Sequence, residues 1–210
     1  MVYPAESRNS STKLDSTTWN LPGQLKLHIH HLNDPSIAPK QLLSRLHQLF
    51  NSIIDQGRTY PIEQPMTQEQ FTSYFFTADL FIGLLTDKPI NQISDNEWDH
   101  VLGGCYYVKP NYVGRSNHIC NAGFIVNLHK RGLGLGSTLG KSYLHYGPKL
   151  GYKGSIFNLV YQSNVASSRI WDGLGFTRAG LVPKAGRLLD TQGNEYYDDA
   201  IIYYKDFESS

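Results

Sequence analysis

Hydrophobic and polar residues alternate along Leu25–His30, which is the period of a β-strand with one exposed face. Further apolar runs predict strands over residues 78–85, 101–108, 119–128, 155–161 and 200–204. The runs 78–85 and 101–108 frame a polar loop, so we expect these two strands to pair in antiparallel fashion.

Apolar residues spaced by three and four predict a helix from Pro39 to Gly57, with the glycine as its C-terminal cap. A shorter helix is predicted over 67–76, and another ends near Gly151. Asn164 stands where an N-cap should, before a helix that ends at Gly175. Because strands alternate with helices, we predict a mixed α/β fold.

Residues 1–23 are rich in Ser and Thr and show no periodicity, so we predict a flexible N-terminal arm that contributes nothing to the fold. The remaining residues, 24–207, contain no linker or internal repeat. With 40% hydrophobic residues in 210, the chain is long enough to bury a full core. We therefore expect a single domain over 24–207.

The segment Ile119–Ser142 runs from an apolar strand through a basic, glycine-rich turn into a helix pattern. Gly132, Gly134 and Gly136 remove side chains at alternate positions, so backbone N–H groups can converge on an anion beside the positive end of the helix. Lys130 adds formal charge next to Arg131. The turn is therefore predicted to bind phosphate.

Spacing separates three phosphate-binding motifs at this turn. The dinucleotide fingerprint G-x-G-x-x-G fails, because Ser137 or Leu139 falls on its third glycine. The P-loop ending at Gly140 fails because it requires glycine where Leu135 stands. The pattern R-x-x-G-x-G fits Arg131 to Gly136, and it resembles the pyrophosphate loop of the GNAT acyl-CoA N-acetyltransferases.

The composition of the chain bears on its binding partners, on membrane association and on the state of its cysteines. A net charge of +1, without a block of five like charges, gives no electrostatic footprint for nucleic acid or an acidic membrane. No apolar run approaches the length of a membrane span, so we expect a soluble protein. Cys105 and Cys120 indicate a reduced, intracellular chain and favour buried packing over a catalytic thiol. His28 and His30 share a strand face, but no third ligand is in view and we expect no metal.

The resemblance to the GNAT family extends over about three quarters of the chain. The blocks CYYVKPNY, CNAGFIVN, GYKGSIFNLV, NVASSRIWDGLGF, GLVPKAG and DAIIYYKD are similar to fungal acetyltransferases of L-azetidine-2-carboxylate and other proline analogues. This resemblance implies a GNAT fold, which is a mixed, mostly antiparallel sheet flanked by helices. The two parallel strands of that sheet, expected at 119–128 and 155–161, splay apart. The resemblance also implies acetyl-CoA as co-substrate, a small imino acid acetylated on its ring nitrogen, detoxification and stress resistance, and a homodimer. We expect it in the cytoplasm, with the mitochondrion left open.

The resemblance also assigns roles to residues. The residues expected to hold acetyl-CoA are Val126, Arg131, Gly132, Leu133, Gly134, Gly136 and Ser137. The residues expected to bind the imino acid are Asn121, Asn158 and Leu159. Asn164 and Asn121 are expected to take part in catalysis. Asn158 interrupts an apolar run, and a buried amide must find partners, which a carboxylate-bearing substrate or the neighbouring backbone could supply. For Asn164, a helix cap and a catalytic role are both open.

Many GNAT enzymes use a tyrosine to protonate the departing CoA thiolate, but the alignment puts Trp171 at that position, and indole cannot supply the proton. The strand 119–128 carries no Asp or Glu to act as a base. We expect water or buffer to take the proton of the amine, and backbone N–H groups near Val126 to stabilise the developing oxyanion. Two alternatives stay open: acetylation of another small amine or peptide, and a non-catalytic acyl-CoA sensor.

Overall fold

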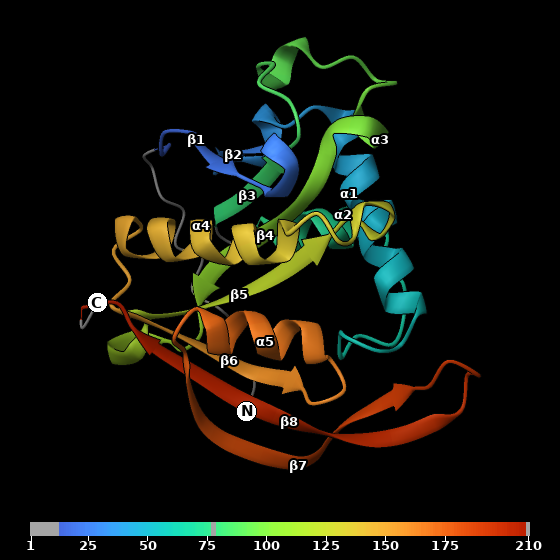
Figure 1. Cartoon of the computed structure of the whole chain (residues 1–210), viewed down its shortest axis with the longest axis vertical. Helices are drawn as coiled ribbons and strands as arrows, with labels where there is room; N and C mark the ends of the chain where they lie inside the picture. The colour runs from blue at the N-terminus through green and yellow to red at the C-terminus, as the bar shows by residue number, and fades with distance from the viewer. Residues whose placement is uncertain (1–12, 77–78, 209–210) are drawn as a thin grey trace.

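The computed structural model describes residues 13–76 and 79–208. Its centre is an eight-stranded sheet with the order β1-β2-β3-β4-β5-β6-β8-β7 (Figure 1). The strands are β1 Thr17–Asn20, β2 Lys26–Leu32, β3 Asp79–Leu84, β4 Leu102–Pro110, β5 Ile119–Val126, β6 Gly154–Tyr161, β7 Thr177–Leu189 and β8 Glu195–Asp206. All neighbours pair antiparallel except β5 and β6, which are parallel. This mixed α/β sheet confirms the predicted fold class.

Helices cover both faces of the sheet (Figure 1). They are α1 Lys40–Asp55, α2 Gln68–Phe75, the short α3 Trp98–Val101, α4 Leu135–Lys149 and α5 Val165–Gly173. Side chains of α4 and α5 pack with one face of the sheet, whereas α1 and α2 pack with the other. The strands β2 to β5 are therefore buried between two separate hydrophobic cores, as their mostly apolar residues require.

The predicted helices form for the reasons that the sequence suggests. The inward face of α1 buries the residues at spacing three and four, and Gly57 follows its end with a positive φ of 62°. Before α2, the Thr67 hydroxyl accepts the N–H of Gln70, whose side chain accepts the N–H of Thr67. This reciprocal capping fixes where α2 begins, and α2 later forms one wall of the site.

Two sequence predictions need correction. Thr17–Asn20, within the arm predicted to contribute nothing to the fold, forms β1 and pairs with β2. The Tyr146 hydroxyl of α4 also donates to the carbonyl of Asp15, at 2.8 Å, which holds this segment by long-range contacts that no local pattern reveals. Val101 belongs to α3, so the strand predicted at 101–108 begins at Leu102. Residues 1–12 and Ala78 lie outside the described residues.

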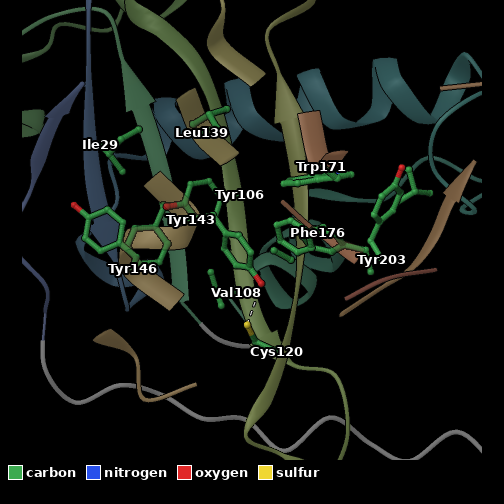
Figure 2. Packing of buried hydrophobic residues seen from close by; sticks show 14 of the residues in the cluster. Ile29, Tyr106, Val108, Cys120, Leu139, Tyr143, Tyr146, Trp171, Phe176 and Tyr203 are labelled. Atoms are coloured by element: carbon green, nitrogen blue, oxygen red, sulfur yellow. Dashed lines mark hydrogen bonds between the residues drawn. The ribbon is translucent and has the colours of Figure 1, made fainter. Parts of the chain in front are cut away.

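The core under α4 is built largely from aromatic rings (Figure 2). Tyr143 lies at its centre, and its hydroxyl donates to Ser155 at 2.6 Å and lies 3.0 Å from the Cys120 sulfur. Burial raises the pKa of Cys120 to about 12, and burial also raises the pKa of Cys105. Both cysteines therefore act as packing residues.

The first prediction concerns these thiols. Because reactivity requires the thiolate, which becomes abundant only as the pH approaches a pKa of about 12, the native protein should react very slowly with Ellman's reagent near pH 8. Unfolding in guanidinium should release both thiols of the chain at once. Rapid titration of one thiol in the native protein would contradict the buried placement.

Candidate functional site

A long groove with a volume of about 1140 Å³ follows the line where β5 and β6 separate. The two strands pair only through Ile119 with Gly154 and Cys120 with Ser155, and they diverge beyond that point, which confirms the predicted splay. The groove is lined by the open edge of β5, the glycine-rich turn before α4, the beginning of α5 and the segment around Tyr60.

The open edge of β5 presents backbone groups to this groove. The N–H of Asn127 donates to Gly103 on the β4 side, at 2.9 Å. Since successive N–H groups of a strand point to opposite edges, the N–H of Val126 points away from β4, toward the side that β6 has left. Val126 lines the groove, so its N–H is available there as a donor, where an oxyanion was expected.

Asn127 anchors the turn that follows β5. Its side-chain oxygen accepts the N–H of His129 at 3.1 Å, and its Nδ2 donates to the carbonyl of Leu102 at 2.8 Å. The residue is buried, so both bonds are shielded from water. The sequence analysis missed this role, although an asparagine directly after a strand and before a glycine-rich turn is a signal for such a cap.

The turn has the geometry of an anion-binding loop. Gly134 is the N-cap of α4 and adopts a left-handed conformation with φ of 76°, and Gly132 has φ of 83°. Gly134 has no side chain to cap the helix, which leaves the N–H groups of the first turn as donors for an anionic ligand. Five residues predicted to hold the cofactor line the groove here: Arg131, Gly132, Gly134, Gly136 and Ser137. The side chain of Leu133 packs against the core instead.

A second hollow of about 630 Å³ adjoins the groove on the face that carries α2, and we call it the asparagine pocket. Its lining residues are Tyr107, Lys109, Pro110, Asn111, Tyr112, Val113, Ser116, Asn121 and Asn158. It shares Tyr107, Asn121 and Asn158 with the groove. A ligand in this pocket can therefore meet one that lies along β5.

Three asparagine side chains form a hydrogen-bonded cluster in the pocket. The Oδ1 of Asn111 accepts from the Nδ2 of Asn121 at 3.1 Å and from the Nδ2 of Asn158 at 2.6 Å. Asn121 also donates to the carbonyl of Ile156 at 3.0 Å, which joins β5 to β6 where their ladder ends. The structure thus brings together two of the three predicted substrate residues, Asn121 and Asn158, and adds Asn111.

The expectation of a buried amide at Asn158 is wrong. Asn158 and Leu159 are exposed, because they lie where β6 changes register against β8, between Phe157 and Val160. An irregular strand turns both side chains out of the core, and both line the groove. Asn121 is half-buried and keeps the structural hydrogen bond that the alternative interpretation required.

Two tyrosines form the aromatic wall between groove and pocket. The ring of Tyr107 lies against Gly123 of β5, where a Cβ would come within 2.5 Å of the ring. The hydroxyl of Tyr74, from α2, is 3.1 Å from that of Tyr107. Burial raises the pKa of both phenols, so they stay neutral hydrogen-bonding groups at physiological pH.

At the other side of the groove, Asn164 is the N-cap of α5 and accepts the N–H of Ser167 at 3.3 Å. Its Oδ1 is used in the cap, and its side chain lines the groove. The indole N–H of Trp171 donates to the Ser167 hydroxyl at 2.9 Å, and the ring is buried. Both predicted roles of Asn164 are compatible with this placement, and the indole N–H is already committed to Ser167.

Among the residues that line the two hollows in the described part of the chain, Asp190 is the only carboxylate. Its oxygens accept backbone N–H groups of Asn194 and Gln192 and the side-chain amide of Asn194, which lower the pKa of Asp190. A carboxylate held this way is a weak base. Within the described residues, no three His, Cys, Asp or Glu side chains form a metal-binding group, and none of the described helices has the length and hydropathy to cross a membrane.

The chain is similar to N-acetyltransferases in both sequence and structure. No protein-family model matches the chain. The chain is 41% identical over 175 residues to the N-acetyltransferase aca1 of Schizosaccharomyces pombe, covering 81% of this chain and 82% of that protein. A GCN5-related N-acetyltransferase from Kribbella flavida aligns with a TM-score of 0.69 at 22% identity, over 86% of this chain and 97% of its own. The yncA protein of Salmonella typhimurium, solved with its cofactor acetyl-CoA, aligns with a TM-score of 0.66 at 12% identity, over 87% and 95%.

The second prediction tests the anion loop. Gly132→Val should weaken CoA binding about tenfold or more, because a side chain there keeps phosphate away from the backbone N–H groups. Gly151→Val is the matched control: both glycines are exposed, have positive φ values of 83° and 87°, and leave open space for a Cβ, but Gly151 is outside the groove. Calorimetry measures both affinities. Equal losses in the two variants would indicate backbone strain alone.

The third prediction separates the two asparagines. Asn158→Ala should raise the KM of the acceptor while leaving thermal stability nearly unchanged, because Asn158 is exposed. Asn121→Ala should raise the same KM and also destabilise the fold by about 1–2 kcal/mol, since the carbonyl of Ile156 loses its donor. Thermal unfolding and steady-state kinetics measure the two effects. An equal rise in the KM of acetyl-CoA would argue against an acceptor site.

Proposed function

Because the chain belongs to the GNAT family of N-acetyltransferases, we propose that it transfers the acetyl group of acetyl-CoA to the ring nitrogen of proline-like imino acids such as L-azetidine-2-carboxylate. The observation that carries this proposal is the junction of two hollows at Asn121 and Asn158. One hollow contains an anion loop suited to a nucleotide-bearing donor, and the other is small and lined by amides. The similarity of the sequence blocks to proline-analogue acetyltransferases supports the choice of acceptor.

The residues of the groove fit acetyl-CoA, which supplies an activated acetyl group as a thioester. Gly132, Gly134 and Gly136 would hold the pyrophosphate at the start of α4, and Arg131 would add a positive charge. The open edge of β5 would accept the pantetheine amides by extending the sheet. The N–H of Val126 lies on this edge and would donate to the acetyl oxygen as negative charge develops on it.

The acceptor amine must lose a proton before it can act as a nucleophile. Asp190 is committed to its turn, and Tyr74 and Tyr107 are neutral because burial raises their pKa values. We therefore infer that water or buffer takes this proton. Asn164 would donate a hydrogen bond from Nδ2 to the sulfur, while its Oδ1 caps α5. Trp171 supplies shape and burial at this point and no proton.

The fourth prediction is the activity itself. Purified protein incubated with acetyl-CoA and L-azetidine-2-carboxylate should release CoA, measured as free thiol, and the N-acetylated product should appear by mass spectrometry in equal amount. Without acceptor, thiol release should fall to the rate of hydrolysis. Because the enzyme's own thiols are buried and react slowly, they add little to the thiol signal of the released CoA.

The same assay separates the alternatives. Turnover of polyamines, aminoglycosides or peptides with none of imino acids would identify an acetyltransferase of another acceptor class. Tight binding of acetyl-CoA without transfer to any amine would identify an acyl-CoA sensor. We also propose a detoxifying role, a homodimer and a cytoplasmic location from the resemblance, and size-exclusion chromatography with light scattering tests the dimer.

A further inference from the structure

A lysine that the sequence analysis did not single out lies beside the predicted acceptor residues. Lys109 is in β4, and its cross-strand partner in β5 is Asn121. Opposite residues of an antiparallel pair project from the same face of the sheet, so the two side chains are neighbours. Both line the asparagine pocket. Lys109 is thus placed at the point where an acceptor would lie.

Two aromatic rings hold the ammonium group of Lys109. Its Nζ is 4.8 Å from the centre of the Tyr74 ring and 4.8 Å from the centre of the Tyr107 ring. These rings are nearly perpendicular, at 84°, and their hydroxyls are 3.1 Å apart. The negative faces of the rings attract the cation and restrict its position. The charge is therefore held at one place in the pocket.

This positive charge lacks a protein counter-ion in the part of the chain that the structure describes. No Asp or Glu there lies within ion-pair distance of Lys109, and none lines the asparagine pocket. The side chain is half-buried, and this burial lowers the pKa of Lys109, because the charged form loses part of its hydration. A half-buried cation without a partner is costly unless a ligand supplies the opposite charge.

The amides around Lys109 favour the same kind of ligand. The single acceptor Oδ1 of Asn111 receives both Asn121 and Asn158, which fixes the orientation of the three amides. Within the described residues, this leaves the Nδ2 of Asn111 as a donor and the Oδ1 atoms of Asn121 and Asn158 as acceptors. Donors suit a carboxylate, and acceptors suit the N–H of an amine. The pocket thus offers complementary groups to both ends of an amino or imino acid.

We propose that Lys109 binds the carboxylate of the acceptor and restricts the enzyme to amines that carry a free carboxylate next to the reacting nitrogen. This proposal rests on the proposed function, because it concerns the acceptor of the same reaction. The ion pair forms between Nζ and the carboxylate oxygens, while Tyr74 and Tyr107 keep the ammonium in position. Lys109 is therefore a specificity-determining residue, and the proton transfers do not involve it.

The test compares L-azetidine-2-carboxylate with its carboxamide, which keeps the ring and the amine but lacks the negative charge. The wild type should prefer the acid. Lys109→Met keeps the length of the side chain and should lower kcat/KM for the acid roughly 10- to 100-fold, as expected for a lost charged hydrogen bond. It should change kcat/KM for the carboxamide less than about threefold and leave the KM of acetyl-CoA unchanged. Lys109→Arg should retain part of the preference for the acid.

Lys26→Met is the matched control, because Lys26 is an exposed strand lysine outside both hollows and should change none of these values. Thermal unfolding and CoA affinity report whether each variant is folded. If Lys109→Met does not fold, the wild-type preference for acid over carboxamide and the Lys109→Arg variant decide the question.

The outcomes distinguish this proposal from the proposed function. Preference for acids among open-chain amino acids, without turnover of imino acids, would overturn the ring specificity and keep the role of Lys109. Equal use of acid and carboxamide by the wild type, or an equal loss for both in Lys109→Met, would overturn the role of Lys109. If no small amine is acetylated, thermal stabilisation of the CoA-bound protein by the acid and not by the carboxamide decides, and its absence overturns the proposal.

Discussion

The separation of β5 from β6 is the constraint on which the functional features of this protein depend. Two adjacent parallel strands would normally continue their ladder, but here the pairing ends after Cys120 and Ser155. The Asn121 side chain satisfies the carbonyl of Ile156 just beyond this point, so the ladder ends without a buried unpaired acceptor. Beyond it, the backbone of β5 faces a groove, and both predicted ligand sites open onto this groove.

Aromatic packing stabilises the region where β5 and β6 separate. Phe124 of β5, Phe157 of β6 and Trp171 of α5 meet on the face covered by α5, with ring centres 4.4–6.1 Å apart. Burial of these large rings stabilises the region where the two strands make no ladder hydrogen bonds, while the free backbone groups of β5 face the groove. These rings thus fill the space between the separated strands on one face, while the two helix-covered cores bury β2 to β5 on both faces.

The sequence predicts those parts of the structure that local interactions determine. The amphipathic spacing of α1, the glycines of the anion loop and the cap at Asn164 all depend on residues within a few positions of one another. The strand β1 depends on pairing with β2 and on Tyr146 far along the chain, so a Ser- and Thr-rich segment gave no signal for it. The charged pocket escapes prediction for the same reason, because Lys109 meets Tyr74 and Asn121 only through sheet register and helix packing.

The contact between Gly123 and Tyr107 has a consequence for how this site can change over generations. Because a Cβ at position 123 would overlap the tyrosine ring, the ring can occupy its place only while the strand opposite has no side chain. A larger residue at 123 is tolerated only after position 107 becomes small, and a small residue at 107 leaves a hole beside the bare backbone. The two positions are therefore expected to vary as a pair among descendants of this sequence, and a change in acceptor size would pass through both.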